Sequence, residues 1–163
     1  ERPELPEPYD TLEANAIHKA RMVGGYTGIA ALADDTGLEV AALGGAPGVF
    51  TARFAGPDAT YADNVAKLLE ELDGVSDRSA RFRTLVALAY PDGSDLTAEG
   101  TLEGRIADEA RGTYGFGYDP VFEVEAMENQ TLAEIPEDEK NQISHRARAL
   151  QALARLLSKS PPP

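Results

Sequence analysis

Apolar residues recur at helical spacing in three parts of the chain. In the first part they are three or four positions apart, which predicts a helix that is capped by Asp10 or Thr11 and ends at Gly24-Gly25. The same spacing predicts a second helix over 59–72 and a third over 137–157. Each of these helices is expected to bury one face and expose the other.

Short apolar runs between turn residues predict strands over 29–33, 38–43, 81–90, 96–102, 103–107 and 121–124. The turn Pro91-Asp92-Gly93 joins two of these runs, which predicts a β-hairpin. Helical and strand patterns are interspersed along 163 residues. We therefore expect a single α/β domain over 1–163, with a mixed β-sheet flanked by helices.

The composition narrows the classes of protein that the chain can represent. It contains 42% apolar residues, enough for a folded core, and no Cys, which excludes disulfides, thiolate metal sites and thiol nucleophiles. The net charge of −13 argues against binding to nucleic acid, which needs cationic contacts with phosphates. No apolar run approaches the roughly 18 residues that cross a bilayer, so we expect a cytoplasmic protein without a membrane partner. Binding of an anionic substrate is still possible if local cations or a divalent metal offset the negative charge of the surface.

Two polar clusters lie in the first quarter of the sequence. Asp34-Asp35-Thr36 follows an apolar run, and adjacent carboxylates there can bind a hard cation and orient water. The same residues can form an Asx-type turn, and the sequence favours neither reading. Glu13 lies three residues after Asp10, at the spacing of a capping box, which is the more common role at such a position. Asn15 and Lys19 complete this cluster on the first predicted helix, and Lys19 could similarly be a solvated lysine.

Two further clusters lie in the C-terminal third. Gly115–Pro120 places glycines beside aromatic residues, so the backbone can approach a flat ligand while the rings stack on it and Asp119 accepts hydrogen bonds. Lys140 and Ser144 are four positions apart on the predicted third helix, next to His145-Arg146, and this face could meet phosphates or a purine edge. Alone, the two clusters are more commonly an aromatic hairpin loop and a solvated, charged helix turn.

Taken together and in order, the clusters closely resemble the inosine triphosphate pyrophosphatase family. The resemblance rests on the first helix from Thr11 to Ala20, on Asp34–Leu38, Leu43–Val49 and Ala52-Arg53, on Gly115–Pro120, and on Lys140-Asn141 with Ser144–Arg146. It implies an elongated α/β fold built around a long mixed sheet, and a homodimer. It also implies magnesium-dependent hydrolysis of ITP, dITP and XTP to the monophosphate and pyrophosphate, which cleanses the nucleotide pool.

The resemblance implies roles for individual residues as well. Asp35 would accept a proton from the attacking water and help to bind Mg2+, with Glu13 as the second metal carboxylate and Asp34 in support. Lys19 would offset phosphate charge during catalysis, and Thr36 would touch the substrate. The residues implied in nucleotide binding are Phe116, Gly117, Tyr118, Asp119, Lys140, His145 and Arg146. Of these, His145-Arg146 would distinguish a 6-oxo purine from adenine.

The family's first strand and its Ser/Thr-x-Asn-x-x-Lys phosphate loop have no counterpart in this sequence, so we expect a fragment of a longer gene product. Loss of one hydrogen-bond donor of the kind that such a phosphate loop supplies costs ~3 kcal/mol of transition-state stabilisation, about a hundredfold in rate. One alternative is a nucleotide-binding or dimerisation module without catalysis. Another is a relative of the Maf-type pyrophosphatases that prefers modified pyrimidines, although Phe116–Pro120 and Ser144–Arg146 argue against it.

Overall fold

The computed structural model describes residues 5–159, which form two compact units. The first unit consists of the residues up to Thr36, Arg83–Thr101 and the residues from His145 onward, and the second consists of Gly37–Phe82 and Leu102–Ser144. The single domain expected over 1–163 stays a prediction, and residues 1–4 and 160–163 lie outside the described part.

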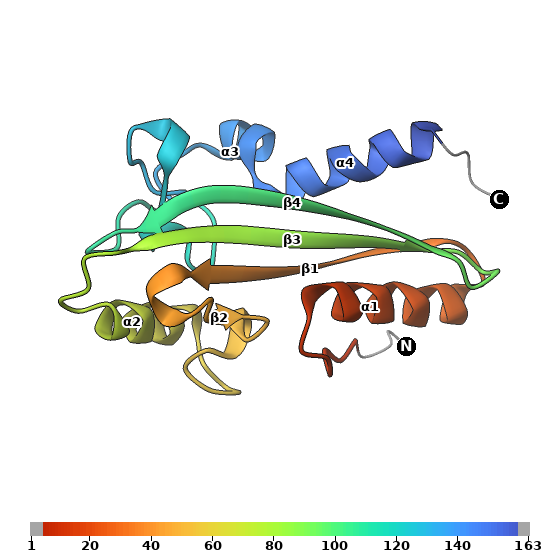
Figure 1. The fold of residues 1–163 in the computed structure, drawn as a ribbon, viewed down its shortest axis with the longest axis horizontal. Coiled ribbons are helices and arrows are strands. Elements are labelled where there is room, and N and C mark those ends of the chain that lie inside the picture. Colours follow the sequence, from red (N-terminus) through yellow and green to blue (C-terminus); the bar gives the residue numbers. More distant parts are fainter. Residues whose placement is uncertain (1–4, 160–163) are drawn as a thin grey trace. The chain divides into compact units, whose positions relative to one another are not determined.

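A five-stranded β-sheet has the strand order β2-β1-β3-β4-β5 (Figure 1). The strands are β1 (Ala31–Val40), β2 (Pro47–Gly48), β3 (Ser79–Ala89), β4 (Asp95–Ile106) and β5 (Phe122–Val124). The helices are α1 (Leu12–Thr27), α2 (Tyr61–Glu71), α3 (Glu137–Ile143) and α4 (His145–Lys159), with short 3-10 helices η1 (Ala41–Leu43), η2 (Thr51–Arg53), η3 (Asp119–Val121) and η4 (Glu125–Met127). β2 pairs with β1, and β5 with β4, in antiparallel register. A sheet flanked by helices confirms the predicted α/β class.

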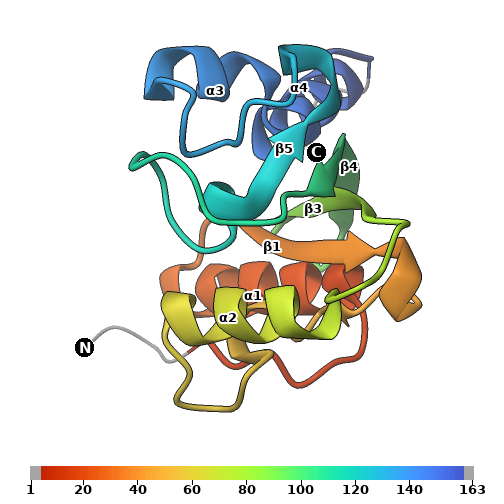
Figure 2. The same ribbon diagram turned by 90° about the vertical axis from the view of Figure 1, so that its left-hand side faces the viewer.

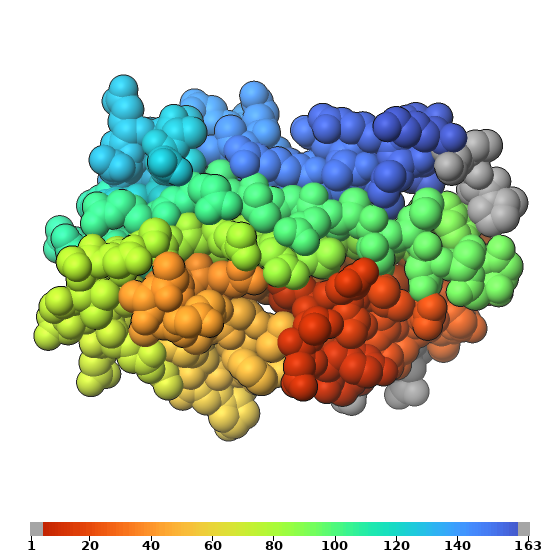
Figure 3. Space-filling view, viewed as in Figure 1, coloured from red at the N-terminus to blue at the C-terminus, as the bar shows by residue number. Residues whose placement is uncertain are grey.

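In the first unit, α1 and α4 cover opposite faces of the strands (Figure 1), and the view along the strands shows the same two layers (Figure 2). Val86 and Ala98 of the strands pack against Ala149 and Leu153 of α4. On the surface of this unit, α1 and α4 lie on either side of the β3–β4 hairpin (Figure 3). The strands of this unit are therefore covered by a helix on each face.

Helix α1 continues through the glycines that were predicted to end it. Gly24 is buried, and a Cβ at this position would lie 3.3 Å from the carbonyl oxygen of Ile29, so the glycine permits close packing. The helix ends at Gly28, whose φ of 73° is left-handed and whose N–H donates to the Gly24 carbonyl at 2.8 Å. The predicted end was wrong because the first two glycines serve the helix interior.

Two predicted strand boundaries were also wrong. One strand, β1, contains residues 31–33 and 38–40 of the first two runs, while 41–43 form η1, and one strand, β4, contains the runs 96–102 and 103–106. Gly37 does not interrupt β1, because a Cβ there would lie 2.7 Å from the Gly48 carbonyl oxygen, and glycine lets β2 pair at this point. Asp34-Asp35 consequently lies within a strand and not at its end. The predicted hairpin between β3 and β4 is confirmed.

The predicted C-terminal helix is interrupted at Ser144. This residue has an extended backbone with ψ 152°, and its N–H donates to the Lys140 carbonyl at the end of α3. The predicted helical face that joins Lys140 to Ser144 is therefore absent, and Lys140 belongs to the second unit while His145 belongs to the first. Within residues 5–159, no helix has both the length and the apolar character needed to cross a membrane.

In the second unit, α2 confirms the helix predicted over 59–72 with slightly shorter bounds. A capping box fixes its start: Thr60 Oγ1 accepts the Asp63 N–H at 3.2 Å, and Asp63 Oδ2 accepts the Thr60 N–H at 2.8 Å. Leu68 and Leu72 are fully buried in a core that includes Phe82 of β3. The first residue of α2, Tyr61, is thereby held in place by a cap and a buried helix face.

Candidate active site

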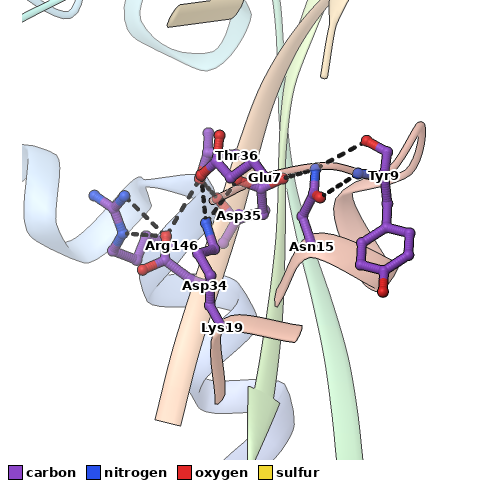
Figure 4. A network of polar contacts seen from close by, with 9 residues as sticks. Glu7, Tyr9, Asn15, Lys19, Asp34, Asp35, Thr36 and Arg146 are labelled. Carbon is purple, nitrogen blue, oxygen red and sulfur yellow. Dashed lines mark hydrogen bonds and ion pairs between the residues drawn. The ribbon is translucent and has the colours of Figure 1, made fainter. Parts of the chain in front are cut away.

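Asp35 lies at the centre of a buried polar network in the first unit (Figure 4). It projects from β1 and is only 7% exposed. Its Oδ1 accepts a hydrogen bond from Lys19 Nζ at 2.9 Å, and its Oδ2 accepts one from Asn15 Nδ2 at 3.2 Å. Both donors are on α1, four positions apart, and so on one face of the helix. One helix face thus fixes both oxygens of a single carboxylate.

The segment that precedes α1 completes the network. Lys19 Nζ also donates to Glu7 Oε1 at 2.7 Å, so one ammonium lies between two carboxylates. The Asn15 amide is held in turn by the backbone of Tyr9, through bonds of 3.0 and 3.2 Å. Lys19 is buried, so the alternative of a solvated lysine is wrong. Each polar group that contacts Asp35 therefore has a second fixed partner.

The network shifts the pKa of both Asp35 and Lys19. Burial raises the pKa of Asp35 above its ordinary value, and the hydrogen bond and charge of Lys19 offset this only in part. Burial lowers the pKa of Lys19, but its bonds with Glu7 and Asp35 outweigh burial, so the pKa of Lys19 is higher than usual. The pair combines a carboxylate that is easier to protonate than usual with an ammonium that stays charged at neutral pH.

Asp34 belongs to a separate network, because successive residues of a strand point to opposite faces. Asp34 Oδ2 accepts hydrogen bonds from Arg146 of α4, from Nε at 3.0 Å and from Nη2 at 2.9 Å. Thr36 Oγ1 lies 3.5 Å from the same oxygen and 2.7 Å from Thr84 Oγ1. The alternative of an Asx-type turn is wrong, since these residues are in regular strand conformation.

Glu13 does not contact this network. The N-cap of α1 is Thr11, which accepts the Ala14 N–H at 3.2 Å, so the alternative of a capping box between Asp10 and Glu13 is also wrong. Glu13 is exposed, and its Oε1 accepts a hydrogen bond from Thr97 of β4 at 3.4 Å. Two positions along a helix correspond to about 200°, which turns Glu13 away from the face that carries Asn15.

The second unit contains another buried carboxylate–ammonium pair. Lys140 Nζ donates to Asp119 Oδ2 at 3.0 Å, and the two residues are 9% and 7% exposed. The same oxygen accepts the Phe116 N–H at 3.1 Å. Gly115 has a φ of 77°, and a Cβ there would overlap both Asp119 and Lys140, so glycine is required where the loop crosses the pair. The alternative of a solvated turn at Lys140 is wrong.

The remaining residues of the Gly-rich loop differ in exposure. Phe116 is 60% exposed, whereas Tyr118 is 3% exposed and packs in the core of the second unit. The Tyr118 hydroxyl donates to the Thr51 carbonyl at 3.0 Å, and burial raises the pKa of this phenol. Gly117 lies between them with a φ of 62°. Thus Phe116, Asp119 and Lys140 come together, while Tyr118 supports them from the core.

His145 and Arg146 occupy the first turn of α4. A close approach fixes this turn on β4, because a Cβ at Gly100 would overlap the backbone of His145 and Ala149. Arg148 Nη1 adds a hydrogen bond to the Thr101 carbonyl at 2.8 Å. Arg146 therefore reaches Asp34 from a helix start that is anchored on its own unit.

Three residues of the two first-unit networks were given no role from the sequence. Asn15 was named in one cluster with Glu13 and Lys19, and its position four residues before Lys19 puts the two side chains on one helix face. Glu7 lies in a Pro-rich segment without periodicity, and Thr84 lies inside an apolar run. Neither of these two positions carries a local pattern that distinguishes it.

The donor set of the first unit fits a magnesium ion. Among the described residues, no group of three or more His, Cys, Asp or Glu side chains is arranged to hold a metal. Mg2+ commonly needs less than this, since it binds through one or two carboxylates together with water and substrate phosphates. Asp35 and Glu7, two carboxylates that share contact with one ammonium, meet that requirement.

Comparison with known proteins finds similarity along nearly the whole chain. A model of the Ham1 family matches residues 1–156. The dITP/XTP pyrophosphatase of Bacillus licheniformis is 50% identical over 160 residues, which cover 97% of this chain and 81% of that protein. The dITP/XTP pyrophosphatase of Syntrophobacter fumaroxidans is 53% identical over 153 residues, which cover 94% and 66%. The structure of a HAM1 protein from Coxiella burnetii matches with a TM-score of 0.90 and 46% identity, covering 97% of this chain and 82% of that one.

Proposed function

The chain belongs to the Ham1 family, and on that premise we propose that it hydrolyses ITP, dITP and XTP to the monophosphate and pyrophosphate. The observation that carries the proposal is the buried Asp35, whose two oxygens are held by Lys19 and Asn15. Proteins that are 50% and 53% identical to this chain are dITP/XTP pyrophosphatases, which supports the same substrate class here.

Asp35 is the general base for the attacking water. Each carboxylate oxygen can accept more than one hydrogen bond, so the bonds from Lys19 and Asn15 leave lone pairs that can accept a hydrogen bond from water. The water oxygen attacks the α-phosphorus, its proton passes to Asp35, and pyrophosphate leaves. Because burial raises the pKa of Asp35, the carboxylate is a stronger base than an ordinary aspartate at neutral pH.

Lys19 supplies positive charge in a chain whose net charge is −13. Its raised pKa keeps the ammonium protonated at the pH where Asp35 is ionised. A fixed cation beside the base attracts the phosphate chain and stabilises the negative charge that develops on the leaving group. Arg146, held on Asp34, offers a second cation in the same unit, and Thr36 beside it is proposed to touch the substrate.

Magnesium is the proposed cofactor, and when bound it would neutralise phosphate charge and lower the barrier to departure of pyrophosphate. Asp35 would hold it, together with Glu7. Glu13 and Asp34 stay proposed ligands from the family resemblance, and their contacts in this structure are with Thr97 and Arg146.

The second unit is proposed to bind the purine base. Phe116 offers an exposed ring, and Lys140 and Asp119 offer a donor and an acceptor close to it. Gly117 and Tyr118 would support the loop. From the family resemblance, His145-Arg146, which belong to the first unit, stay the residues proposed to distinguish a 6-oxo purine from adenine, since a polar group that is left unpaired by the wrong base rejects that base.

Assembly and location are part of the same proposal. We propose a homodimer that acts on the cytoplasmic nucleotide pool. Light scattering coupled to gel filtration would measure twice the chain mass of 17.4 kDa for a dimer. A mass equal to one chain at micromolar concentration would contradict the dimer and leave the catalytic proposal untouched.

Product analysis with a panel of nucleotides tests the activity. The chain is incubated with magnesium and ITP, XTP, ATP or GTP, and pyrophosphate and orthophosphate are measured separately. We expect pyrophosphate from ITP and XTP in preference to ATP and GTP. His145→Ala should reduce this preference, whereas Tyr26→Ala, an exposed position on α1, should leave it unchanged. Orthophosphate as the main product, or equal rates with ATP and ITP, would contradict the proposal.

A further inference from the structure

Two large aromatic side chains lie exposed next to each other in the second unit. Tyr61 is 59% exposed and Phe116 is 60% exposed, and their ring centroids are 6.2 Å apart with planes tilted by 41°. Single exposed apolar residues are common, but neighbouring exposed rings more often mark a surface that binds something. Tyr61 has no part in the roles described above.

Each of the two rings projects from a backbone that is firmly held. Tyr61 is the first residue of α2 and directly follows the N-cap Thr60, inside the capping box that Thr60 forms with Asp63. Phe116 donates its N–H to Asp119, which is itself bound to Lys140. Rings on fixed backbone lose little conformational entropy when a ligand binds, so their exposed surface is well suited to recognition.

The surroundings of the rings indicate the chemistry of the ligand. Lys140 Nζ lies 6.0 Å from the Phe116 ring centroid, and the Asp119 carboxylate is bound to that ammonium. A flat heterocycle needs both kinds of contact that meet here, an aromatic surface for its face and a donor and acceptor for its edge. Purine and pyrimidine bases have this character, whereas a lipid or an aliphatic chain has no polar edge to match.

We propose that Tyr61, together with Phe116, forms an aromatic platform on which the purine base of the substrate stacks. This inference deepens the proposed function and rests on it for the identity of the base. Stacking on an aromatic ring discriminates little between bases, because every base presents a π-face. Tyr61 therefore strengthens the binding of 6-oxo and 6-amino purines by the same factor, and the choice between them is made by other residues.

A fluorescence titration tests the contact directly. The chain contains no Trp, so Tyr61→Trp introduces a single tryptophan at the platform. IMP is expected to quench its emission with saturation, and ribose 5-phosphate, which lacks the base, is expected to have no effect. Unchanged emission with IMP overturns the platform, whether equilibrium dialysis shows that IMP binds elsewhere on the chain or does not bind at all.

Kinetics separate a stacking role from a structural one. Tyr61→Ala should raise KM for ITP and for ATP by the same factor, about tenfold for the loss of one stacking partner, with kcat unchanged. Tyr61→Phe keeps the ring and should restore KM. Tyr26→Ala, which removes an exposed tyrosine from the first unit, is the matched control and should have no effect. An unchanged KM in Tyr61→Ala overturns the platform.

The two readouts distinguish the failure of this inference from failure of the proposed function. If IMP quenches the Tyr61→Trp emission but no pyrophosphate is released from ITP, the platform stands and the pyrophosphatase assignment fails. If ITP is hydrolysed and neither the emission nor KM responds to changes at Tyr61, the assignment stands and the platform is overturned.

Discussion

The two units each contain a buried aspartate–lysine pair with almost the same geometry, yet the surroundings of the pairs differ. The N–O distance is 2.9 Å between Lys19 and Asp35 and 3.0 Å between Lys140 and Asp119, and the burial of the partners is alike. In the first pair the lysine is shared with a second carboxylate, Glu7. In the second pair the aspartate accepts a backbone N–H from a loop. Geometry alone therefore does not define the role of such a pair.

The two pairs differ in what their aspartates are prepared to do. In the first unit a cation is shared between two carboxylates, and burial raises the pKa of Asp35, so this carboxylate is prepared to take up a proton. In the second unit Asp119 fixes the backbone of Phe116, so this pair is prepared to position a loop. We interpret the first pair as catalytic and the second as part of a binding surface.

Replacement of the two lysines should separate the roles of the two pairs most clearly. Loss of one partner from a buried pair costs about 3–5 kcal/mol, so Lys19→Met and Lys140→Met should both lower the free energy of unfolding, as measured by urea denaturation. Under conditions where both variants are folded, only Lys19→Met should lose kcat, while Lys140→Met should mainly raise KM. Equal losses of kcat in the two variants would contradict the division of roles.

Gly115→Ala perturbs the second pair without changing either partner. The added methyl group would overlap Asp119 and Lys140 at a φ of 77°, and overpacking of this kind costs about 1–3 kcal/mol. KM for ITP should rise while kcat is retained. Gly25→Ala, inside α1, is the control. No other atom lies within 4 Å of a Cβ added at this position, so the change should stabilise the fold by about 0.5–1 kcal/mol. A large loss of kcat in Gly115→Ala would argue against a purely binding role.

The pH dependence of kcat/KM should report the first pair. The base must be ionised, and burial raises the pKa of Asp35, so activity should fall on acidification at a higher pH than an ordinary aspartate would give. Stability depends on pH in the opposite sense. The folded state favours the protonated form of Asp35, so the free energy of unfolding falls as the pH rises through the folded-state pKa of Asp35. An acid limb at or below the ordinary aspartate pKa would contradict this assignment.

Asn15→Ala should shift that acid limb further. The hydrogen bond from Asn15 lowers the pKa of Asp35, so its removal should move the limb to higher pH. The lost hydrogen bonds should cost about 1–3 kcal/mol of stability, measured by denaturation, because buried polar groups lose their partners. The same change at Asn129, in the second unit, is the control for the pH profile. An acid limb that stays in place would show that Asn15 does not act on Asp35.

The sequence was sufficient to predict the fold class and most helices and strands. The helix over 59–72 and the hairpin at Pro91-Asp92-Gly93 follow from local periodicity and turn residues, and both are present. The errors occurred at Gly24-Gly25 and Gly37, where glycine permits close packing inside an element, and at Ser144, where a helix breaks without Gly or Pro. The packing at Gly24 and Gly37 depends on tertiary contacts that a single sequence does not carry.

The candidate site was predictable in part for the same reason. Asp35, Lys19, Asp119 and Lys140 were selected from motifs, and the structure joins them into two pairs. The separation of Asp34 from Asp35 follows from strand alternation, but only once the residues are known to lie within a strand and not at its end. Long-range partners such as Glu7 and Thr97 have no local signal and require the fold.

The rate of pyrophosphate release from ITP by Asp35→Asn tests the central claim most directly. This variant keeps the bond between Lys19 and Glu7, so no buried ammonium is left unpaired, and the fold should be retained at neutral pH. We expect kcat to fall by about 10²–10⁴ with little change in KM, as for the loss of a general base. A folded Asp35→Asn protein that releases pyrophosphate at the wild-type rate would contradict the assignment of Asp35 as the catalytic base.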